Sequence, residues 1–400
     1  MYKPNDLILQ KYADLLVKFA LGGGTGIKQG ETVFMTIPES AKDFIAPLRR
    51  SVLSSGGHPI FNYLPDGVNP GEFYELASEE QLSFFPDRMY RGIVDQSDHT
   101  LRMLSEFDKY ELKGVDSKKL MTQSKAMKPY TDWRFEKENQ GKLTWVLASY
   151  GTEAMAKDVG MTLEEYWEQI IKACYLDLDD PIGRWKEIFS EQERLKKILN
   201  DLKIEKLHVE GAHTDLWVQL GATRKWLGGS GRNIPSFELF VSPDWRGTNG
   251  YIYFNQPLYR FGNRIRDIKL VFKEGVIIES SASENEQLLK DMIAVANADK
   301  IGEYSLTDSR MSRITKLMGE TLFDENFGGE QGNTHLAVGM AYKDSYVGEM
   351  SLVTPEQWNE LGFNDSAIHT DIISTEKRTV TAYLLDGSTK VIYDNGQFLV

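Results

Sequence analysis

The segment that most constrains the fold is a strand, helix and strand pattern between residues 32 and 64. Residues 32–37 are mainly β-branched and apolar, residues 40–53 show helical spacing with Ser40 as the expected N-cap, and residues 58–64 predict a second strand. Two strands joined by one helix at this spacing pair in parallel through a right-handed crossover. The chain therefore opens as an α/β fold.

The same alternation continues for about half of the chain. A short strand is expected at residues 92–95 and a stronger one at residues 143–148, and Pro181 fits the first turn of a long amphipathic helix. We therefore expect residues 1–205 to form an α/β N-terminal domain with a mainly parallel sheet flanked by helices.

The second half has a different pattern. Residues 267–272 and 276–279 predict an antiparallel hairpin, and Ser283 with Glu286 predicts a capping box that opens a helix. A chain of 400 residues also exceeds the size at which one core usually stops growing. We expect residues 206–400 to form a β-rich (α+β) C-terminal domain.

Composition limits the partners and the compartment. With 46 Lys and Arg against 59 Asp and Glu, the formal net charge is −13, which repels phosphate backbones, so nucleic acid is not an expected partner. Cys174 is the only cysteine and fits a core position, and a chain without disulfides suits a reducing compartment. Charges interrupt the N-terminal residues, and no apolar run reaches membrane-span length. We expect a cytoplasmic protein with no membrane partner.

Two glycine-rich stretches raise the question of a phosphate-binding loop. Residues 22–26 follow a helix and precede a strand, which is the reverse of the order that directs amides and a helix dipole at an anion. Residues 228–231 lack the following Lys-Ser/Thr pair. Both are better interpreted as turns.

The chemistry concentrates between residues 321 and 371. This region places His335 and His369 near Tyr342 and Asp371, and imidazole, phenolate and carboxylate ligands suit zinc, cobalt or manganese. His369 and Asp371 are two residues apart, so an extended strand directs both to one face. The alternative is that His335 is a hydrogen-bonded core histidine and Asp371 caps a turn.

Four further residues upstream offer ligands. His213 and Asp215 form a second possible metal pair, although Asp215 at the head of a strand also suits local turn hydrogen bonds. Glu238 interrupts an apolar strand entry, so its carboxylate is either directed inward towards a cation or left exposed on the surface. Glu303 follows a glycine that lets another group approach closely.

Four motifs in this order resemble the aminopeptidase T / aminopeptidase S family of dinuclear metallopeptidases. They are GRNIPSFE ending at Glu238, IGE ending at Glu303, TLFDENFGGEQGNTHLAVGMAY with His335 and Tyr342, and GFNDSAIHTD with His369 and Asp371. Similarity in the opening LQKYADLLVKFA, in VEGAHTDL and in KEGVI extends the resemblance over most of the chain.

The resemblance implies a metal-dependent aminopeptidase that releases N-terminal residues from peptides by attack of a metal-activated water. It implies two divalent ions, zinc, cobalt or manganese, and a homodimer that encloses the active site. The six ligands that it implies are Glu238, Glu303, His335, Tyr342, His369 and Asp371. Glu303 is also the expected catalytic residue, because a second carboxylate oxygen can handle protons.

The sequence departs from the family pattern in a long glycine-rich loop at residues 22–26 and in the segment 327–332, which is expected to reshape the rim of the site. Two other functions use the same ligands. One is a different dinuclear metallohydrolase, an amidase or a phosphoesterase, for which Arg232, Arg264 and Lys343 are candidate phosphate clamps. The other is a catalytically silent relative that binds peptides.

Overall fold

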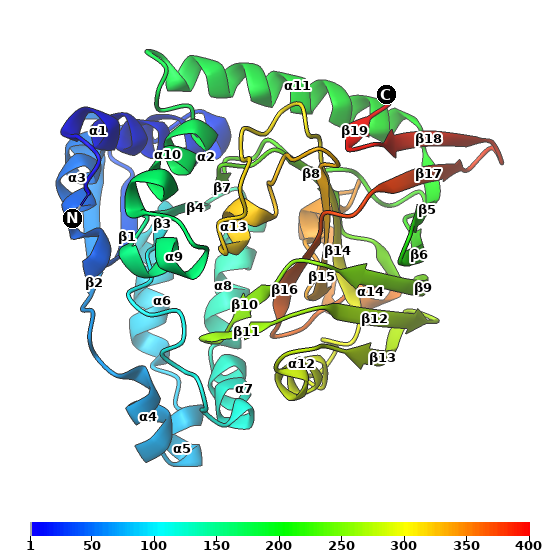
Figure 1. Ribbon diagram of the computed structural model, residues 1–400, viewed down its shortest axis with the longest axis horizontal. Coiled ribbons are helices and arrows are strands. Elements are labelled where there is room, and N and C mark those ends of the chain that lie inside the picture. The colour runs from blue at the N-terminus through cyan, green and yellow to red at the C-terminus, as the bar shows by residue number, and fades with distance from the viewer. Residues whose placement is uncertain (1) are drawn as a thin grey trace.

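A parallel sheet of five strands lies at one end of the molecule (Figure 1). In this computed structural model, which describes residues 2–400, the strand order is β2-β1-β3-β4-β7. The strands are β1 (Thr32–Pro38), β2 (His58–Leu64), β3 (His99–Leu104), β4 (Thr144–Ser149) and β7 (Asn233–Ile234). The β1 and β2 strands pair in parallel, with Thr32 opposite His58, which confirms the predicted strand, helix and strand unit.

Two local predictions in this half are wrong. Ser40 does not cap the helix: it lies in the 3₁₀ helix η2 (Glu39–Phe44), which leads into α3 (Ile45–Ser54), and its hydroxyl donates to the carbonyl of Ser105. The residues expected as a strand at 92–95 lie instead in helix α6 (Asp87–Gln96). Their short apolar run supplies the buried side of that helix, whereas the alternating residues of β3 form the central strand.

The N-terminal half, described from residue 2, contains ten further helical segments besides η2, α3 and α6. The long helix predicted from Pro181 is confirmed as α11, and α10 begins with a capping box. The helical segments are α1 (Asp6–Leu15), η1 (Leu16–Ala20), α2 (Leu21–Gly24), α4 (Pro70–Leu76), α5 (Glu79–Ser83), α7 (Ser117–Ala126), α8 (Lys128–Asn139), α9 (Glu153–Asp158), α10 (Leu163–Ala173) and α11 (Pro181–Asp201). Cys174 ends α10 and is fully buried, as its predicted core position requires.

Antiparallel sheets make up the other end of the molecule. The larger sheet has the order β13-β12-β9-β6-β5-β17-β18-β19, and a four-stranded sheet has the order β16-β15-β14-β8. The first contains β5 (Ile204–Gly211), β6 (Thr214–Gln219), β9 (Asp244–Phe254), β12 (Ile268–Lys273), β13 (Val276–Ser281), β17 (Arg378–Leu384), β18 (Thr389–Asp394) and β19 (Gln397–Phe398). The second contains β8 (Glu238–Val241), β14 (Ile301–Thr307), β15 (Asn333–Gly339) and β16 (His369–Ser374).

The other elements of this half are short, and the predicted N-cap of one helix is wrong. The pair β10 (Leu258–Arg260) and β11 (Asn263–Ile265) forms a separate ribbon. Ser283 does not cap helix α12 (Glu286–Ile293): Asn285 is the N-cap residue, and the Ser283 hydroxyl donates to Asp267. The remaining helical turns are α13 (Thr321–Asp324), η3 (Lys343–Ser345), η4 (Met350–Leu352) and α14 (Pro355–Glu360). The mixed architecture confirms the predicted fold class.

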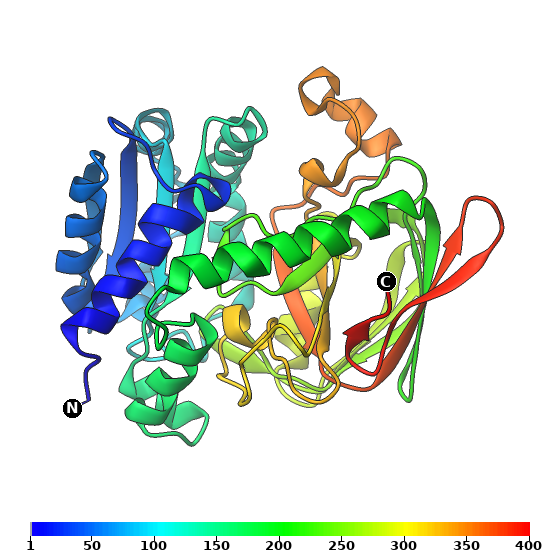
Figure 2. The ribbon, with the colours of Figure 1, turned by 90° about the horizontal axis from the view of Figure 1, so that it is seen from above.

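Helix α11 joins the two ends of the molecule. Figure 2 shows this long green helix running across both the parallel-sheet end and the antiparallel end. Trp185, Ile188 and Phe189 near its start belong to the core under the parallel sheet, whereas Leu195 and Leu199 belong to the core of the antiparallel end. One rigid helix therefore fixes part of each hydrophobic core.

Two other segments cross the predicted boundary near residue 205. Strand β7 extends the parallel sheet by pairing with β4, and Ile314, Met318 and Phe323 are buried in the core of the parallel-sheet end. The division into residues 1–205 and 206–400 therefore stays a prediction, and the two ends share buried segments.

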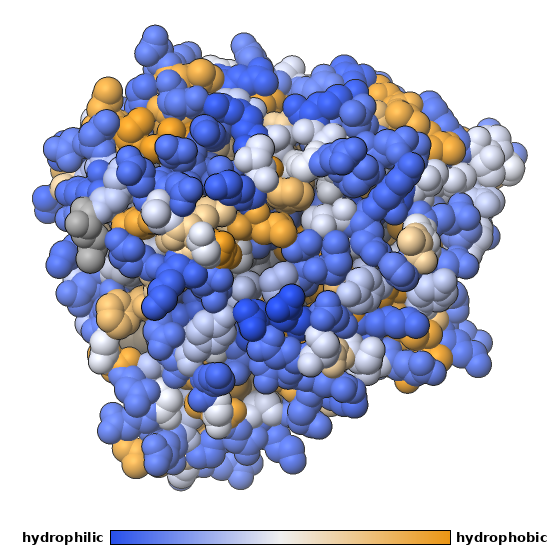
Figure 3. Space-filling model, in the orientation of Figure 1, coloured by the Kyte–Doolittle hydropathy of each residue, from blue (hydrophilic) through white to orange (hydrophobic). Residues whose placement is uncertain are grey.

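The surface agrees with the high charge of the chain. On the face shown in Figure 3, hydrophilic side chains predominate and the apolar ones form scattered groups. Across residues 2–400, no helix combines the length and the apolar character that crossing a bilayer requires.

Trp185 offers a test of how α11 supports the rest of the fold. Its indole is fully buried, stacks on Phe237 with ring centroids 5.2 Å apart, and donates to the carbonyl of Cys174 at 3.1 Å. We expect Trp185→Ala to lower the free energy of unfolding by about 3–5 kcal/mol, because it leaves a large cavity. Chemical denaturation measures the change. The exposed control Leu53→Ala should change it by less than about 0.5 kcal/mol, and an equal effect of both would contradict this role.

Candidate metal centre

Five ionisable side chains project from one face of the four-stranded sheet. In the register of the strands, Glu303 lies opposite Ala337, which in turn lies opposite Asp371, while Gly339 lies opposite His369. Because side chains alternate along a strand, residues two apart share a face. The residues that this register places on one face are Glu238, Glu303, His335, His369 and Asp371. The same-face prediction for His369 and Asp371 is therefore confirmed.

Small residues make room for these side chains to converge. Ala337 and Gly339 occupy the strand positions between Glu303 on one side and Asp371 and His369 on the other. A side chain at Gly339 would approach the backbone oxygen of Ile368 to 1.9 Å, so only glycine fits there. The middle of this sheet face therefore carries only small residues, and the candidate ligands lie on either side of them.

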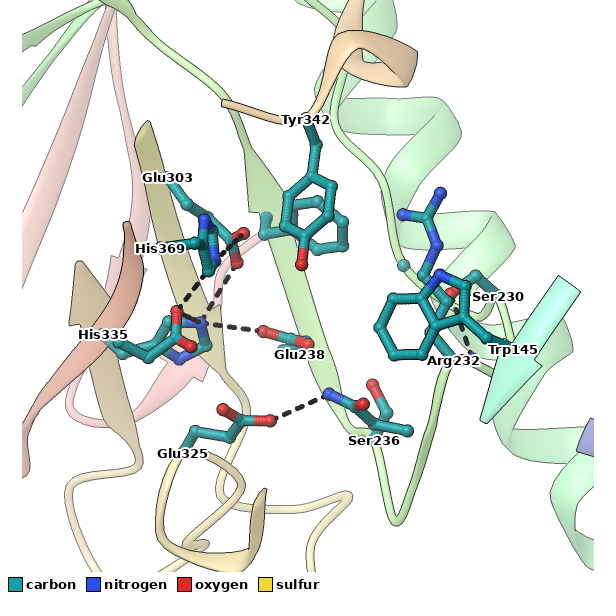
Figure 4. A pocket seen from close by; sticks show the side chains of 14 residues that line it. Trp145, Ser230, Arg232, Ser236, Glu238, Glu303, Glu325, His335, Tyr342 and His369 are labelled. Atoms are coloured by element: carbon teal, nitrogen blue, oxygen red, sulfur yellow. Dashed lines mark hydrogen bonds and ion pairs between the residues drawn. The ribbon is translucent and has the colours of Figure 1, made fainter. Parts of the chain in front are cut away.

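The side chains form two triads that share Glu303. Nε2 of His335 lies 3.1 Å from Oε2 of Glu238 and 3.1 Å from Oε1 of Glu303. Nε2 of His369 lies 3.4 Å from Oδ1 of Asp371 and 3.7 Å from Oε2 of Glu303. Within each triad, one ligand atom from each residue lies within 4.8 Å of the others. Figure 4 shows the labelled members of both triads on one side of the pocket.

The second ring nitrogen of His369 sets its orientation. Nδ1 lies 2.7 Å from the carbonyl oxygen of Met340, and a proton donated there leaves the Nε2 lone pair directed at Glu303 and Asp371. Metal-binding histidines commonly donate their other N–H to a carbonyl in this way. This contact therefore suits a neutral imidazole ligand.

Tyr342 completes the predicted set. Its backbone N–H donates to Oγ of Ser242 at 2.8 Å, and its ring lies 4.9 Å from the ring of His369 and 5.7 Å from that of Phe240. Figure 4 shows the phenolic oxygen pointing into the pocket. Burial raises the pKa of Tyr342 well above its usual value, and the nearby carboxylate of Glu303 raises it further.

The electrostatics of the cluster are dominated by crowded carboxylates. Burial raises the pKa of Glu303 to about 7, and Glu238 adds to that shift although the hydrogen bond to His335 opposes it. Burial alone would lower the pKa of His335, yet the carboxylate of Glu238 holds that pKa well above its usual value. In the same way Asp371 raises the pKa of His369 to about 9 against the effect of burial.

Three carboxylates, those of the buried Glu238 and Glu303 and of the partly exposed Asp371, share their space with two imidazoles, so their negative charge needs compensation at low dielectric. Two nitrogen and several oxygen ligands fit zinc, cobalt or manganese, and ligand protonation competes with metal. The residues present therefore fit a divalent metal centre.

The sequence analysis missed Glu325. Its carboxylate lines the same small cavity of about 40 Å³ and accepts from Nδ2 of Asn233 at 3.0 Å. Burial raises the pKa of Glu325 well above its usual value, and the charge of Glu238 adds to the shift. Its only sequence signal was its place in the DEN segment, where the neighbouring Asn326 accepts from the N–H of Phe237 and so fixes the entry to β8.

The expected phosphate clamps are already engaged. The guanidinium of Arg232 contacts Glu138 at 2.9 Å and also Asp344, and Arg264 contacts Glu284 at 3.0 Å. The ammonium of Lys343 lies over the ring of Trp358. These three cations therefore do not form the clamp that a phosphoesterase requires.

The second histidine and aspartate pair does not form a metal site. Nδ1 of His213 contacts Glu376 at 2.7 Å, whereas Asp215 contacts Nε2 of His208 at 2.8 Å. Residues 214 and 215 begin strand β6, so His213 lies in the turn before it. The two side chains have separate partners on the antiparallel sheet.

The glycine-rich stretches pack closely against other backbone, as turns do. A side chain at Gly231 would approach the carbonyl oxygen of Ala20 to 2.1 Å, so the loop 228–231 lies directly on the end of the first helices. Gly228 and Ser230 of that loop line the metal cavity. In the segment 327–332, a side chain at Gly332 would meet the hydroxyl of Tyr393, so that glycine packs against β18.

Comparison with known proteins identifies the class of enzyme. The sequence model of the family described as "Thermophilic metalloprotease (M29)" matches residues 5–398. The chain is 28% identical to aminopeptidase PepS of Streptococcus thermophilus and 25% identical to aminopeptidase T of Thermus aquaticus, covering 98% of each chain in both cases. The structure of wild-type AmpT from Thermus thermophilus superimposes with a TM-score of 0.82 at 24% identity, over 98% of this chain and 99% of that one.

A metallopeptidase is thus the class that the fold and the cluster define. The chain belongs to the thermophilic metalloprotease family M29, which confirms the family suggested by the four motifs. It is a metal-dependent peptide-bond hydrolase, as its sequence motifs predicted.

Glu320 lines a cavity beside the candidate ligands, and its raised pKa can be tested through the pH dependence of stability. Its Oε2 is buried without a hydrogen-bond partner among residues 2–400, and burial raises the pKa of Glu320 to about 8 from 4.5. Between these values the folded protein holds more protons than the unfolded chain, so the free energy of unfolding falls as pH rises. We expect Glu320→Gln to flatten that slope by up to about 1.4 kcal/mol per pH unit.

The measurement is chemical denaturation at a series of pH values between 4.5 and 8. The exposed control Glu75→Gln should retain the slope of the wild-type protein. A Glu320→Gln slope that matches the wild type would show that Glu320 ionises normally in the folded state.

Proposed function

We propose that this protein is a dinuclear metalloaminopeptidase that releases N-terminal residues from peptides. The observation that carries the proposal is the pair of triads that share Glu303, because one carboxylate with an oxygen directed at each triad suits two neighbouring ions. The proposed ligands are Glu238, Glu303, His335, Tyr342, His369 and Asp371.

These residues would hold two divalent ions, which would supply Lewis-acid polarisation of the scissile carbonyl and a lower pKa of the attacking water. The protein supplies the remaining functions. Glu303 is the proposed catalytic residue: an oxygen of its carboxylate that is not holding an ion would take a proton from the attacking water and pass it to the leaving amine. The free α-amine of a peptide can coordinate an ion or pair with a carboxylate of the site, which confines cleavage to the first residue.

The peptide substrate is favoured over the two alternative functions. Membership in a metalloprotease family and relatives named aminopeptidases support peptide bonds as the target. The two arginines that the sequence suggested as phosphate clamps, Arg232 and Arg264, are already paired with carboxylates. A catalytically silent relative would bind peptides without releasing leucine from leucinamide, so an assay with added metal separates the two.

The identity of the ions, the assembly, the location and the partners are further parts of this proposal. We propose zinc, cobalt or manganese as the ions, a homodimer as the assembly, and the cytoplasm as the location, with no nucleic-acid partner. The metal-binding part is proposed to comprise residues 206–400. Metal analysis and the mass of the assembly in solution test the first two.

Metal removal tests the two-ion centre. We expect chelation to abolish release of leucine from leucinamide, and one of the three ions to restore it at two equivalents per chain. At a free ion concentration of 100 times the Kd, each bound ion should raise the free energy of unfolding by about 2.7 kcal/mol. Metal analysis, activity and thermal unfolding are measured together. A single equivalent that restores full activity would contradict a dinuclear centre.

Replacement of Glu303 tests its assigned role. We expect Glu303→Gln to reduce kcat by at least about 100-fold while the protein retains at least one metal ion, because the amide is a weaker ligand and cannot accept a proton. The matched control is Glu279→Gln, on the exposed part of β13, which should behave as the wild type. Unchanged turnover in Glu303→Gln would remove this residue from the mechanism.

A further inference from the structure

Three arginines gather beside the proposed metal centre. Arg102 lies on β3, Arg134 on α8 and Arg260 at the end of β10. Among the residues that the structure describes, none of the three forms an ion pair within 4 Å, although the chain as a whole carries a net charge of −13. Cations that remain unpaired in an acidic protein call for an anion from elsewhere.

Most of their hydrogen-bonding capacity is unused. Arg260 donates from Nη2 to the carbonyl of His369 at 3.3 Å, and Arg134 donates from Nη2 to Oγ1 of Thr100 at 3.4 Å. Nε of Arg134 and Nε of Arg260 are buried without a hydrogen-bond partner in residues 2–400. Each guanidinium has five N–H donors in a planar fork that matches a carboxylate.

The three groups influence one another, which places them in one electrostatic environment. Burial lowers the pKa of the Arg102 guanidinium, and repulsion from Arg134 adds to it. Burial likewise lowers the pKa of Arg260, where Asp371 opposes the shift and Arg102 increases it. Such mutual repulsion is relieved when an anion binds between the charges.

Two adjoining cavities connect these arginines to the proposed metal ligands. One of about 270 Å³ is lined by Arg134 and Arg260, and the other of about 450 Å³ by Arg102 and Arg260. Both are also lined by Tyr342 and His369. Their sizes are those of small-ligand sites. The larger one is also lined by the acidic residues Glu106, Glu320 and Glu325 and by Lys109, whose ammonium lies 3.7 Å from Asp158.

We propose that Arg102, Arg134 and Arg260 bind the C-terminal carboxylate of short peptides, so that the enzyme prefers dipeptides and tripeptides with a free C-terminus. This inference rests on the proposed aminopeptidase function. An extended peptide advances roughly 3.5 Å per residue, so a carboxylate one or two residues beyond the scissile bond lies close to the metal centre. Arg260 meets that requirement, because it contacts the backbone of His369.

The test compares matched substrates on the full-length holoenzyme. The substrates are leucyl-alanine, leucyl-alanine amide and leucyl-aspartic acid α-amide, and the readout is kcat/KM for leucine release. We expect the free acid to exceed its amide by about tenfold, mainly through a lower KM, because charge-assisted hydrogen bonds to the carboxylate are lost in the amide. Equal values for the free acid and the amide would overturn the proposal.

The double variant Arg102→Gln with Arg134→Gln should reduce that tenfold ratio to about one. These two arginines are chosen because neither contacts a proposed ligand. Replacing both by lysine should give an intermediate ratio, since lysine keeps the charge and loses the planar fork. The control Arg194→Gln, on the surface of α11 and paired with Glu191, should keep the wild-type ratio. A ratio that stays near ten in both double variants would overturn the assignment.

The remaining outcomes distinguish a C-terminal carboxylate from an acidic side chain as the bound anion. They also distinguish failure of the carboxylate site from failure of the aminopeptidase function. If leucyl-aspartic acid α-amide is preferred over leucyl-alanine amide while a free C-terminus brings no gain, the arginines bind an acidic side chain and the proposal is wrong. If the metal-loaded enzyme releases no leucine from any substrate or from leucinamide, the aminopeptidase function itself fails. If leucinamide is cleaved but the free acid has no advantage, only the carboxylate site fails.

Discussion

The crowding of carboxylates on one face of a sheet is the constraint on which the site depends. Glu238, Glu303 and Asp371 are held against one another and against two imidazoles in a region that is largely closed to water. Such an arrangement is unfavourable unless protons, imidazolium groups or metal ions compensate the charge. Burial raises the pKa of Glu303, and Asp371 raises the pKa of His369 against the effect of burial, so protons can compensate part of this charge. Divalent ions would replace those protons with charges that are better matched to the geometry.

The rest of the fold keeps these groups in place. Glu238 begins β8, and the buried side chain of Gln192 on α11 donates to the backbone carbonyls of Ser236 and Glu238. Ser305 on β14 donates its hydroxyl to the Glu238 carboxylate at 2.9 Å. Because α11 is anchored in both hydrophobic cores, the strand that presents Glu238 is fixed relative to both ends of the molecule. The proposed metal centre is therefore supported by both ends, although five of its six proposed ligands lie on the antiparallel sheet.

Local sequence patterns were sufficient to predict the regular strands and hairpins and the residues with metal-ligand chemistry. The β1 and β2 pair, the β12 and β13 hairpin and the ligand pair on β16 all follow from periods of two or from turn residues. The failures have local causes: the apolar run at 92–95 belongs to a helix, and Ser40 and Ser283 bond to distant groups instead of capping helices. Glu325, Arg102 and Arg260 were missed because their roles depend on contacts between distant segments, which spacing along a chain does not encode.

The charges around the site define a direction for a bound peptide. The proposed metal centre suits the free α-amine of a peptide, as an ion ligand or as the partner of a carboxylate, and the three arginines suit a carboxylate, with Tyr342 and His369 lining the space between them. A short peptide carries an amine and a carboxylate at its two ends, so only one orientation satisfies both regions. That orientation brings the first peptide bond, rather than the last, next to Glu303. Selectivity for the N-terminal residue thus follows from charge separation within the cleft as well as from the metal ligands.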